Sequence, residues 1–139
     1  NLYMVKPLGF EVSEKHFRRA GLDYHDFANV KIIDSFNELL EQNKDKQFYF
    51  ASTKSKKTYA DVSYPEDCFI VFGKESRGLP ENLLAEHYEE CIRIPMRPDF
   101  RSLNLSNAVA VVAFEAMRQL DFDGMEDVGH LTGRPEFAD

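Results

Sequence analysis

The chain has 139 residues, 43% of them hydrophobic, and a formal net charge of −7 at pH 7. This length favours one domain. Folding at this size removes roughly 68–70% of the unfolded chain's surface from water, which is enough for a hydrophobic core that needs no disulfide or structural metal. No apolar run approaches the ~18 residues of a membrane span, and no secretory leader opens the sequence, so we expect a cytoplasmic protein.

Five short segments rich in β-branched and aromatic residues, bounded by turn residues, predict β-strands. They are residues 2–5, 30–33, 48–52, 69–72 and 91–94. Four further segments predict helices, at residues 14–20, 36–43, 81–85 and 107–120. Strands that alternate with helices indicate an α/β fold with a mostly parallel sheet. Residues 121–139 are acidic and glycine-rich, which predicts a loose tail.

Capping signals fix where the predicted helices begin. Ser13 is expected to cap the first helix, and Ser35 with Glu38 forms a capping box for the second. Pro80 suits the first turn of the third helix, and Ser106 is predicted to cap the fourth. In the fourth helix, residues at helical spacing predict one apolar face. They are Val109, Val112, Ala113, Ala116, Met117 and Leu120.

The cysteines and histidines give no sign of a metal site. Cys68 and Cys91 lie in separate apolar stretches, so we expect buried thiols rather than a disulfide or a metal pair. The four histidines lack the spacing of metal ligands. They are His16, His25, His87 and His130.

The net negative charge argues against a nucleic-acid partner, because phosphate contacts need lysine and arginine. The basic residues nevertheless cluster at 15–19, 54–57 and 93–101. An acidic protein with such loops can bind RNA at one face. Ordinary solvated surface explains the clusters too, and charge alone favours that interpretation.

The first informative motif is Phe-Gly-Lys-Glu-Ser-Arg-Gly-Leu-Pro at residues 72–80, directly after a predicted strand. Its glycine spacing matches neither the dinucleotide fingerprint nor a phosphate loop, which disfavours a nicotinamide or ATP enzyme. One interpretation is that Gly73 lets a ligand approach the strand end without a Cβ in the way. The other is a tight strand-to-helix connection in which Glu75 pairs with Arg77. The motif alone leaves both open.

The second motif begins at residues 94–96, Ile-Pro-Met, and continues into a cluster of short polar side chains at 102–107. The proline ends a strand with a fixed φ and no amide donor, and the methionine offers adaptable surface to an aromatic ring. A helix N-terminus needs one or two caps, which the last two residues of the cluster supply. Ser102 and Asn104 then remain unexplained. Together the two motifs indicate a cofactor pocket, made mostly of backbone, at the strand ends.

These two motifs resemble the SPOUT class of S-adenosylmethionine-dependent RNA methyltransferases. Residues 18–25, Arg-Arg-Ala-Gly-Leu-Asp-Tyr-His, and residues 94–108 are similar to the TrmL subgroup, which comprises tRNA (cytidine/uridine-34) 2′-O-methyltransferases acting at the wobble nucleotide. The similarity covers nearly all the chain. It implies one domain over residues 1–139, with a mostly parallel sheet flanked by helices and a C-terminal trefoil knot.

The resemblance places S-adenosylmethionine in the knot, bent so that its methyl group faces outward. The residues it implies for cofactor binding are Ala51, Gly73, Ile94, Met96, Ser102 and Leu103. Glu75 and Asn104 match polar groups near the reacting methyl group and are the candidate catalytic residues. A carboxylate offsets the sulfonium charge, and an amide can orient the cofactor or the ribose hydroxyl.

The resemblance also implies a homodimer that binds the anticodon loop of tRNA, without a metal and away from membranes. Candidate tRNA contacts are Arg18, Arg19, Tyr24 and Lys54, for which solvated surface is the competing explanation.

Two features depart from the family pattern. The family carries an N-terminal strand and helix with an Asn-x-Gly-x-x-x-Arg motif, whose arginine is proposed to activate the ribose hydroxyl, and this sequence begins after it. Phe114 stands where the subgroup commonly has tyrosine. Two alternatives stay open. One is an rRNA 2′-O-methyltransferase of the same class, and the other, suggested by the missing arginine motif, is a non-catalytic RNA- or nucleotide-binding module of the same fold.

Overall fold

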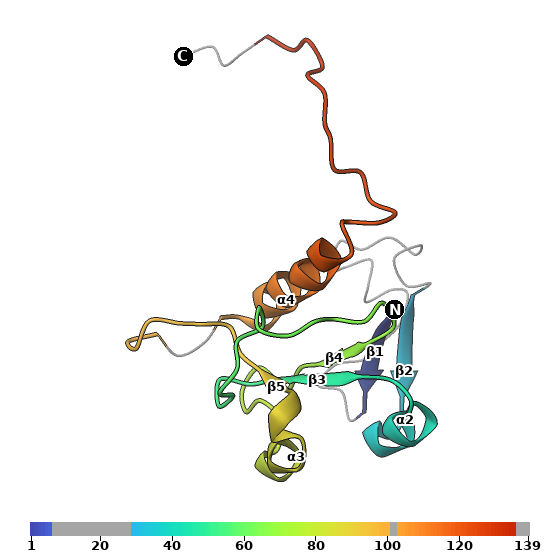
Figure 1. Cartoon of the computed structure of the whole chain (residues 1–139), viewed down its shortest axis with the longest axis vertical. Coiled ribbons are helices and arrows are strands. Elements are labelled where there is room, and N and C mark those ends of the chain that lie inside the picture. Colours follow the sequence, from blue (N-terminus) through green and yellow to red (C-terminus); the bar gives the residue numbers. More distant parts are fainter. Residues whose placement is uncertain (7–28, 101–102, 136–139) are drawn as a thin grey trace. The chain divides into compact units, whose positions relative to one another are not determined.

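The computed structural model describes residues 1–6, 29–100 and 103–135. The chain divides into two compact units, Asn1–Asp45 and Lys46–Asp139, and each is considered by itself (Figure 1). The helix expected at 14–20, its cap Ser13, and the candidate tRNA contacts Arg18, Arg19 and Tyr24 lie outside the described residues.

The first unit contains a parallel pair of strands and one helix. Strand β1 (Leu2–Val5) pairs with β2 (Val30–Ile33) from Leu2 opposite Val30 to Val5 opposite Ile33. Helix α2 (Phe36–Gln42) begins after Ser35, whose hydroxyl accepts a 3.3 Å hydrogen bond from the Glu38 N–H. Both predicted strands and the predicted cap are confirmed.

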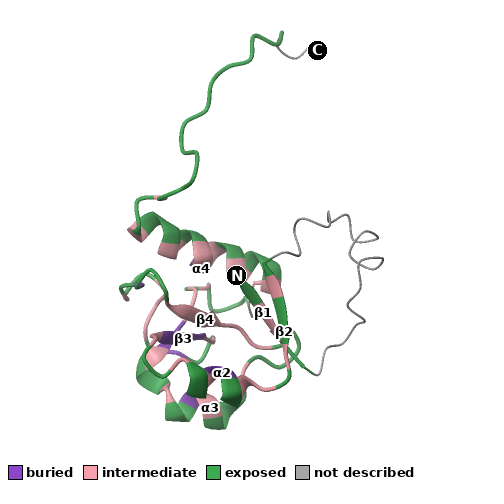
Figure 2. Ribbon diagram, turned by 90° about the vertical axis from the view of Figure 1, so that its right-hand side faces the viewer, coloured by how far each residue is buried: buried purple, intermediate pink, exposed green. Residues whose placement is uncertain are grey.

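The second unit is built on a three-stranded parallel sheet. Strands β3 (Phe48–Ala51), β4 (Phe69–Val71) and β5 (Cys91–Ile92) lie in the order β4-β3-β5. The first three residues of β3 are buried, as expected for a central parallel strand covered on both faces. Figure 2 shows this burial at β3.

Helices cover both faces of this sheet. In both views α4 (Leu105–Gln119) lies on one face, and α3 (Glu81–Glu86) lies on the other. Tyr49 and Ile92 point toward α4 and form the core with Tyr64 and Val112. On the opposite face Phe50 stacks on His87 with ring centroids 4.7 Å apart, next to the short 3-10 helix η2 (Tyr88–Glu90). The alternation of side chains along β3 thus builds two apolar layers.

Strand β5 is shorter than predicted, because Arg93 leaves the β3 ladder and pairs with Thr58 instead. Strands β3 and β4 each end one residue earlier than expected. Pro80 occupies the N-cap position of α3 rather than its first turn.

The start of α4 also differs from the prediction, since Asn104 and not Ser106 is its N-cap. Its apolar face is rotated as well. Val112 is fully buried and Ala116 packs against the core, but Met117 and Leu120 are each 38% exposed. Gln119 faces inward near the end of the helix, because its side-chain amide hydrogen-bonds the Val62 carbonyl and the Tyr64 N–H. Helical periodicity alone did not reveal this polar anchor.

After α4 the chain makes tight turns and then has no regular structure. Asp121 and Phe122 adopt φ values of 55° and 54°, and the Phe122 N–H donates to the Met117 carbonyl at 2.9 Å. Residues 126–135 are exposed and contain neither helix nor strand. Within the described part of the chain, no helix has the length and apolar character to cross a membrane.

Candidate functional site at the carboxyl edge of the second sheet

The parallel order β4-β3-β5 brings three predicted cofactor-binding residues to one edge of the sheet. Ala51 ends β3 and pairs with Ile92, while the preceding Phe50 pairs with Val71. Gly73 and Ile94 therefore follow the neighbouring strands on either side of Ala51. This carboxyl edge is where open parallel sheets bind ligands. The predicted gathering of Ala51, Gly73 and Ile94 agrees with this topology.

Gly73 is required by a closed turn in its own loop. The Gly78 N–H donates to the Lys74 carbonyl at 2.7 Å, and Gly78 has a φ of +70°. A Cβ on residue 73 would overlap the backbone of Gly78 and Leu79. The direction in which a Cβ on residue 73 would point is thus filled by the protein, so the missing Cβ makes room for the turn rather than for a ligand. The turn leaves Glu75 and Arg77 exposed.

The expected Glu75–Arg77 ion pair is not among those that the described residues form, so the competing prediction for this turn is also wrong in that detail. The turn is closed by its backbone and leaves both charged side chains in solvent. The Glu75 carboxylate is therefore not neutralised by Arg77 at the edge of the sheet.

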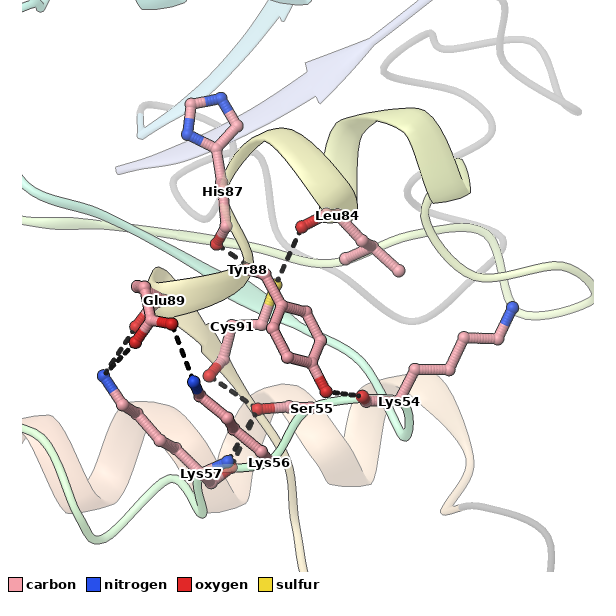
Figure 3. Close-up of polar contacts among 9 residues, drawn as sticks. All are labelled: Lys54, Ser55, Lys56, Lys57, Leu84, His87, Tyr88, Glu89 and Cys91. Atoms are coloured by element: carbon pink, nitrogen blue, oxygen red, sulfur yellow. Dashed lines mark hydrogen bonds and ion pairs between the residues drawn. The ribbon is translucent and has the colours of Figure 1, made fainter.

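The loop after β3 is fastened to β5 by a buried serine. The Ser55 hydroxyl donates to the Cys91 carbonyl at 2.6 Å and accepts from the Lys57 N–H at 3.1 Å (Figure 3). The Ser52 N–H donates to the Ile92 carbonyl at 2.9 Å. A buried hydroxyl must find partners, and here those partners tie together the ends of two adjacent strands.

The lysine side chains of this loop pair with glutamates of the protein. Lys54 forms an ion pair with Glu81, and Lys56 pairs with Glu89 at 2.7 Å. Lys57 lies 3.6 Å from the Glu89 carboxylate (Figure 3). The hydrogen bond from Lys56 lowers the pKa of Glu89, and the one from Lys54 lowers the pKa of Glu81. Lys57 is half-buried and the other four residues are exposed, so solvent screens the pairs and each contributes little to stability.

Arg93 organises the same edge and was missed by sequence reasoning. Its N–H donates to the Lys57 carbonyl at 2.9 Å, and its own carbonyl accepts from the Tyr59 N–H at 2.8 Å. Its guanidinium donates to the Thr53 carbonyl at 3.0 Å. The loop after β3 therefore wraps around the residue that precedes Ile94. The available signal was a long cationic side chain inside an apolar strand, where polar contacts must compensate it.

The second motif contributes half-buried apolar side chains and a helix cap. Met96 and Leu103 are half-buried. The Asn104 side-chain oxygen accepts from the Asn107 N–H at 3.0 Å and from the Ser106 hydroxyl at 2.9 Å. The cap thus explains Asn104, which the sequence left unexplained, and it occupies the oxygen while the amide nitrogen keeps its donor capacity. Ser102 lies outside the described residues.

Other potentially reactive groups are not among the predicted site residues. Both cysteines are free, and burial raises the pKa of Cys68 and of Cys91, so neither is a ready thiolate. The Cys91 thiol donates to the His87 carbonyl at 3.3 Å. A surface cavity of about 290 Å³ is lined by Glu66, Leu120, Asp121 and Asp123, none of them a predicted site residue. Among the described residues no cluster could hold a metal ion.

Comparison with known proteins decides the family. Residues 1–114 match the model of the SpoU rRNA Methylase family. The chain belongs to this family. Over 124 residues the methyltransferase is 44% identical to the tRNA (cytidine(34)-2′-O)-methyltransferase of Escherichia coli (strain K12), a match that covers 88% of this chain and 79% of that protein.

Two solved structures show the same arrangement. A putative RNA methyltransferase from Bacillus anthracis superposes with a TM-score of 0.83 at 38% identity, covering 91% of this chain and 81% of the other. A protein described in connection with the 2-OH methylation of C/U34 on tRNA gives a TM-score of 0.78 at 38% identity, covering 87% and 79%. The predicted α/β architecture with parallel strands is thereby confirmed and is that of SpoU-type methyltransferases, and the protein is a methyltransferase.

Proposed function

We propose that this methyltransferase transfers a methyl group to the ribose 2′-hydroxyl of the wobble nucleotide of tRNA, a cytidine or modified uridine at position 34. The observation that carries the proposal is 44% identity, over 88% of the chain, to a tRNA (cytidine(34)-2′-O)-methyltransferase. The structural likeness to a protein described for C/U34 methylation supports the same substrate. Family membership disfavours the non-catalytic alternative.

The proposed methyl donor is S-adenosylmethionine, which supplies an electrophilic methyl carbon on a sulfonium centre when bound. The residues at the carboxyl edge fit such a ligand, because half-buried Met96 and Leu103 offer apolar surface for a base. The backbone at Ala51, Gly73 and Ile94 would hold its polar groups. Ser102 is a further proposed contact. We also propose that the C-terminal half forms the family's trefoil knot around this site.

Two polar side chains are proposed to act near the reacting methyl group. Glu75 is exposed, and Arg77 does not neutralise it, so its carboxylate is free to offset positive charge on the donor. Asn104 has its oxygen committed to the helix cap and only its amide N–H groups to spare. We therefore propose Asn104 as a donor that orients the cofactor or the ribose hydroxyl for in-line displacement.

The remaining proposals concern partners and organisation. Arg18, Arg19, Tyr24 and Lys54 are proposed tRNA contacts, and Lys54 must exchange its partner Glu81 for a phosphate to serve as one. We propose a cytoplasmic homodimer, with one methyltransferase domain per chain followed by a loose tail. The exposed Phe114 on α4 is a candidate for the dimer face.

A second candidate substrate is ribosomal RNA, because the matching family model is described as an rRNA methylase family. The two substrates are separated by assaying methyl transfer from labelled S-adenosylmethionine to tRNA and to rRNA, each isolated without the modification. We expect incorporation into tRNA alone. Incorporation into rRNA alone would replace the proposed substrate. Ser102→Ala and Asn104→Ala should each lower the rate, and full activity in both would overturn the site assignment.

A further inference from the structure

A proline turn brings the backbones of Arg97 and Phe100 together directly after Met96, a proposed cofactor contact. The Phe100 N–H donates to the Arg97 carbonyl at 3.0 Å, which closes a turn with Pro98 and Asp99 at its centre. Proline presets the backbone of the second turn position, and aspartate is common in such turns. Because the first and last residues of a turn are neighbours in space, Arg97 and Phe100 form one feature. It follows Met96 directly.

Phe100 is among the most exposed large apolar residues of the second unit. Its exposed fraction is 58%, although the ring is held on a closed turn rather than on a loose tail. The ring contacts of the described chain do not include it. A single exposed phenylalanine is ordinary on protein surfaces. The reason to assign Phe100 a function is that arginines unpaired among the described residues lie on the same turn and on the neighbouring loop.

The exposed cations of the two motif loops differ from those of the lysine loop. Lys54, Lys56 and Lys57 pair with glutamates. Arg77 and Arg97 are exposed, and neither forms an ion pair among the described residues. Both follow strands that flank β3, so both lie on loops at the carboxyl edge of the sheet. On a chain with net charge −7, unpaired cations thus remain next to the proposed site.

We propose that the turn of residues 97–100 is a contact site for single-stranded RNA, in which the Phe100 ring stacks on a base next to the methylated nucleotide and Arg97, with Arg77, binds phosphates. Unpaired bases in RNA loops are recognised by stacking on aromatic rings, and arginines supply the electrostatic part of affinity. The proposal rests on the proposed function in that the substrate is RNA. It adds phosphate contacts at Arg77 and Arg97 to the one proposed at Lys54.

The ring is tested with Phe100→Ala, Phe100→Leu and Phe100→Trp, using an anticodon stem–loop RNA that carries 2-aminopurine beside the wobble nucleotide. We expect Ala and Leu to weaken binding about 5- to 150-fold, the range for one lost base stack. Trp should retain affinity and quench the 2-aminopurine fluorescence. The matched control Leu131→Ala removes another exposed apolar side chain, 101% exposed in the tail, and should bind as the unaltered protein does.

The charge is tested with Arg97→Ala against Arg134→Ala, an exposed arginine of the tail. Arg97→Ala should reduce the salt dependence of RNA binding by about one unit of slope, whereas the control should not. Binding of S-adenosylhomocysteine, measured by calorimetry, should stay unchanged in all variants, which shows that the donor site is folded. RNA binding that is unaltered in both Phe100→Leu and Arg97→Ala would overturn the proposal.

Failure of the proposed RNA contact site can be distinguished from failure of the proposed function. If the unaltered protein methylates ribosomal RNA instead of tRNA, the wobble assignment fails. The same variants are then measured on a single-stranded fragment of the methylated ribosomal RNA. Loss of affinity on that fragment supports the contact site, and unchanged affinity contradicts it.

Discussion

Gln119, near the end of α4, donates a 2.9 Å hydrogen bond from its side-chain amide to the carbonyl of Val62. The oxygen of the same amide accepts from the Tyr64 N–H, also at 2.9 Å. One side chain thus satisfies a donor and an acceptor of a segment more than fifty residues earlier in the chain. That segment begins at Thr58, which pairs with Arg93, so α4 is linked to the loop that borders the candidate site.

Replacing Gln119 with leucine should destabilise the second unit. The change leaves the Val62 carbonyl and the Tyr64 N–H without their partners, at a cost of about 1–3 kcal/mol in the free energy of unfolding. Chemical denaturation measures the loss. The same substitution at exposed Gln42, which ends α2, is the matched control and should cost less than about 0.5 kcal/mol. Equal effects at the two sites would show that the anchor contributes nothing.

Glu115 should make stability depend on acid pH. Hydrogen bonds from Arg118, at 2.8 and 3.1 Å, and from Gln119, at 2.9 Å, lower the pKa of Glu115 to about 2. A carboxyl whose pKa is lowered by folding stabilises the protein above its unfolded pKa, near 4.5, and this contribution is lost as the pH falls toward 2.

The difference in unfolding free energy between the unaltered protein and Glu115→Gln should therefore be largest near neutral pH and shrink between about pH 4.5 and 2. Denaturation at a series of pH values measures it. Exposed Glu126→Gln in the tail is the control and should show no such trend. A difference that is constant across this range would contradict the assigned pairing.

The two glycines of the first motif should respond differently to alanine. Gly73→Ala places a Cβ against the backbone of Gly78 and Leu79, which cannot move without opening the turn, and we expect a cost of at least about 2 kcal/mol. At Gly78 a Cβ has open space, and only the positive φ is penalised, at about 1–2 kcal/mol. Thermal unfolding of both variants gives the comparison. A greater loss at Gly78 would mean that the turn is not closed over Gly73.

Asn104 has two separable roles, and two substitutions distinguish them. Asn104→Ala removes the cap of α4 and should cost about 0.5–2 kcal/mol, whereas Asn104→Asp keeps an acceptor oxygen and should retain most of the stability. Asp lacks the amide donor, so methyl transfer should stay low in both variants. If Asn104→Asp restores stability and activity together, Asn104 acts only as a helix cap.

The strands could be predicted from the sequence because parallel strands that are covered on both faces consist of continuous apolar residues. The cap of α2 could be predicted because Ser35 and Glu38 have the spacing of a capping box. Prediction from the sequence failed where long-range contacts decide the outcome. Arg93 pairs with Thr58 through a register that no local pattern encodes. Gln119 faces inward only because Val62 and Tyr64 present backbone groups to it.

In the candidate site, too, some features could be predicted from the sequence and others depend on the fold. The strand ends Ala51, Gly73 and Ile94 could be placed from chain order, because parallel strands share a carboxyl edge. The reason for the glycine at 73 could not, since it depends on how the next turn folds back. Ser106 and Asn104 are equally good caps by composition, and only the backbone path selects Asn104. Phe100 drew no attention, because exposure cannot be read from residue type.

The central claim is most directly tested by locating the transferred methyl group. Two anticodon stem–loops, one with cytidine and one with 2′-deoxycytidine at the wobble position, are incubated with the protein and labelled S-adenosylmethionine, and the products are sequenced by mass spectrometry. We predict a 2′-O-methylcytidine at the wobble position of the first RNA and no incorporation into the second. Equal incorporation into both RNAs, or methylation at another nucleotide, would contradict the proposed reaction.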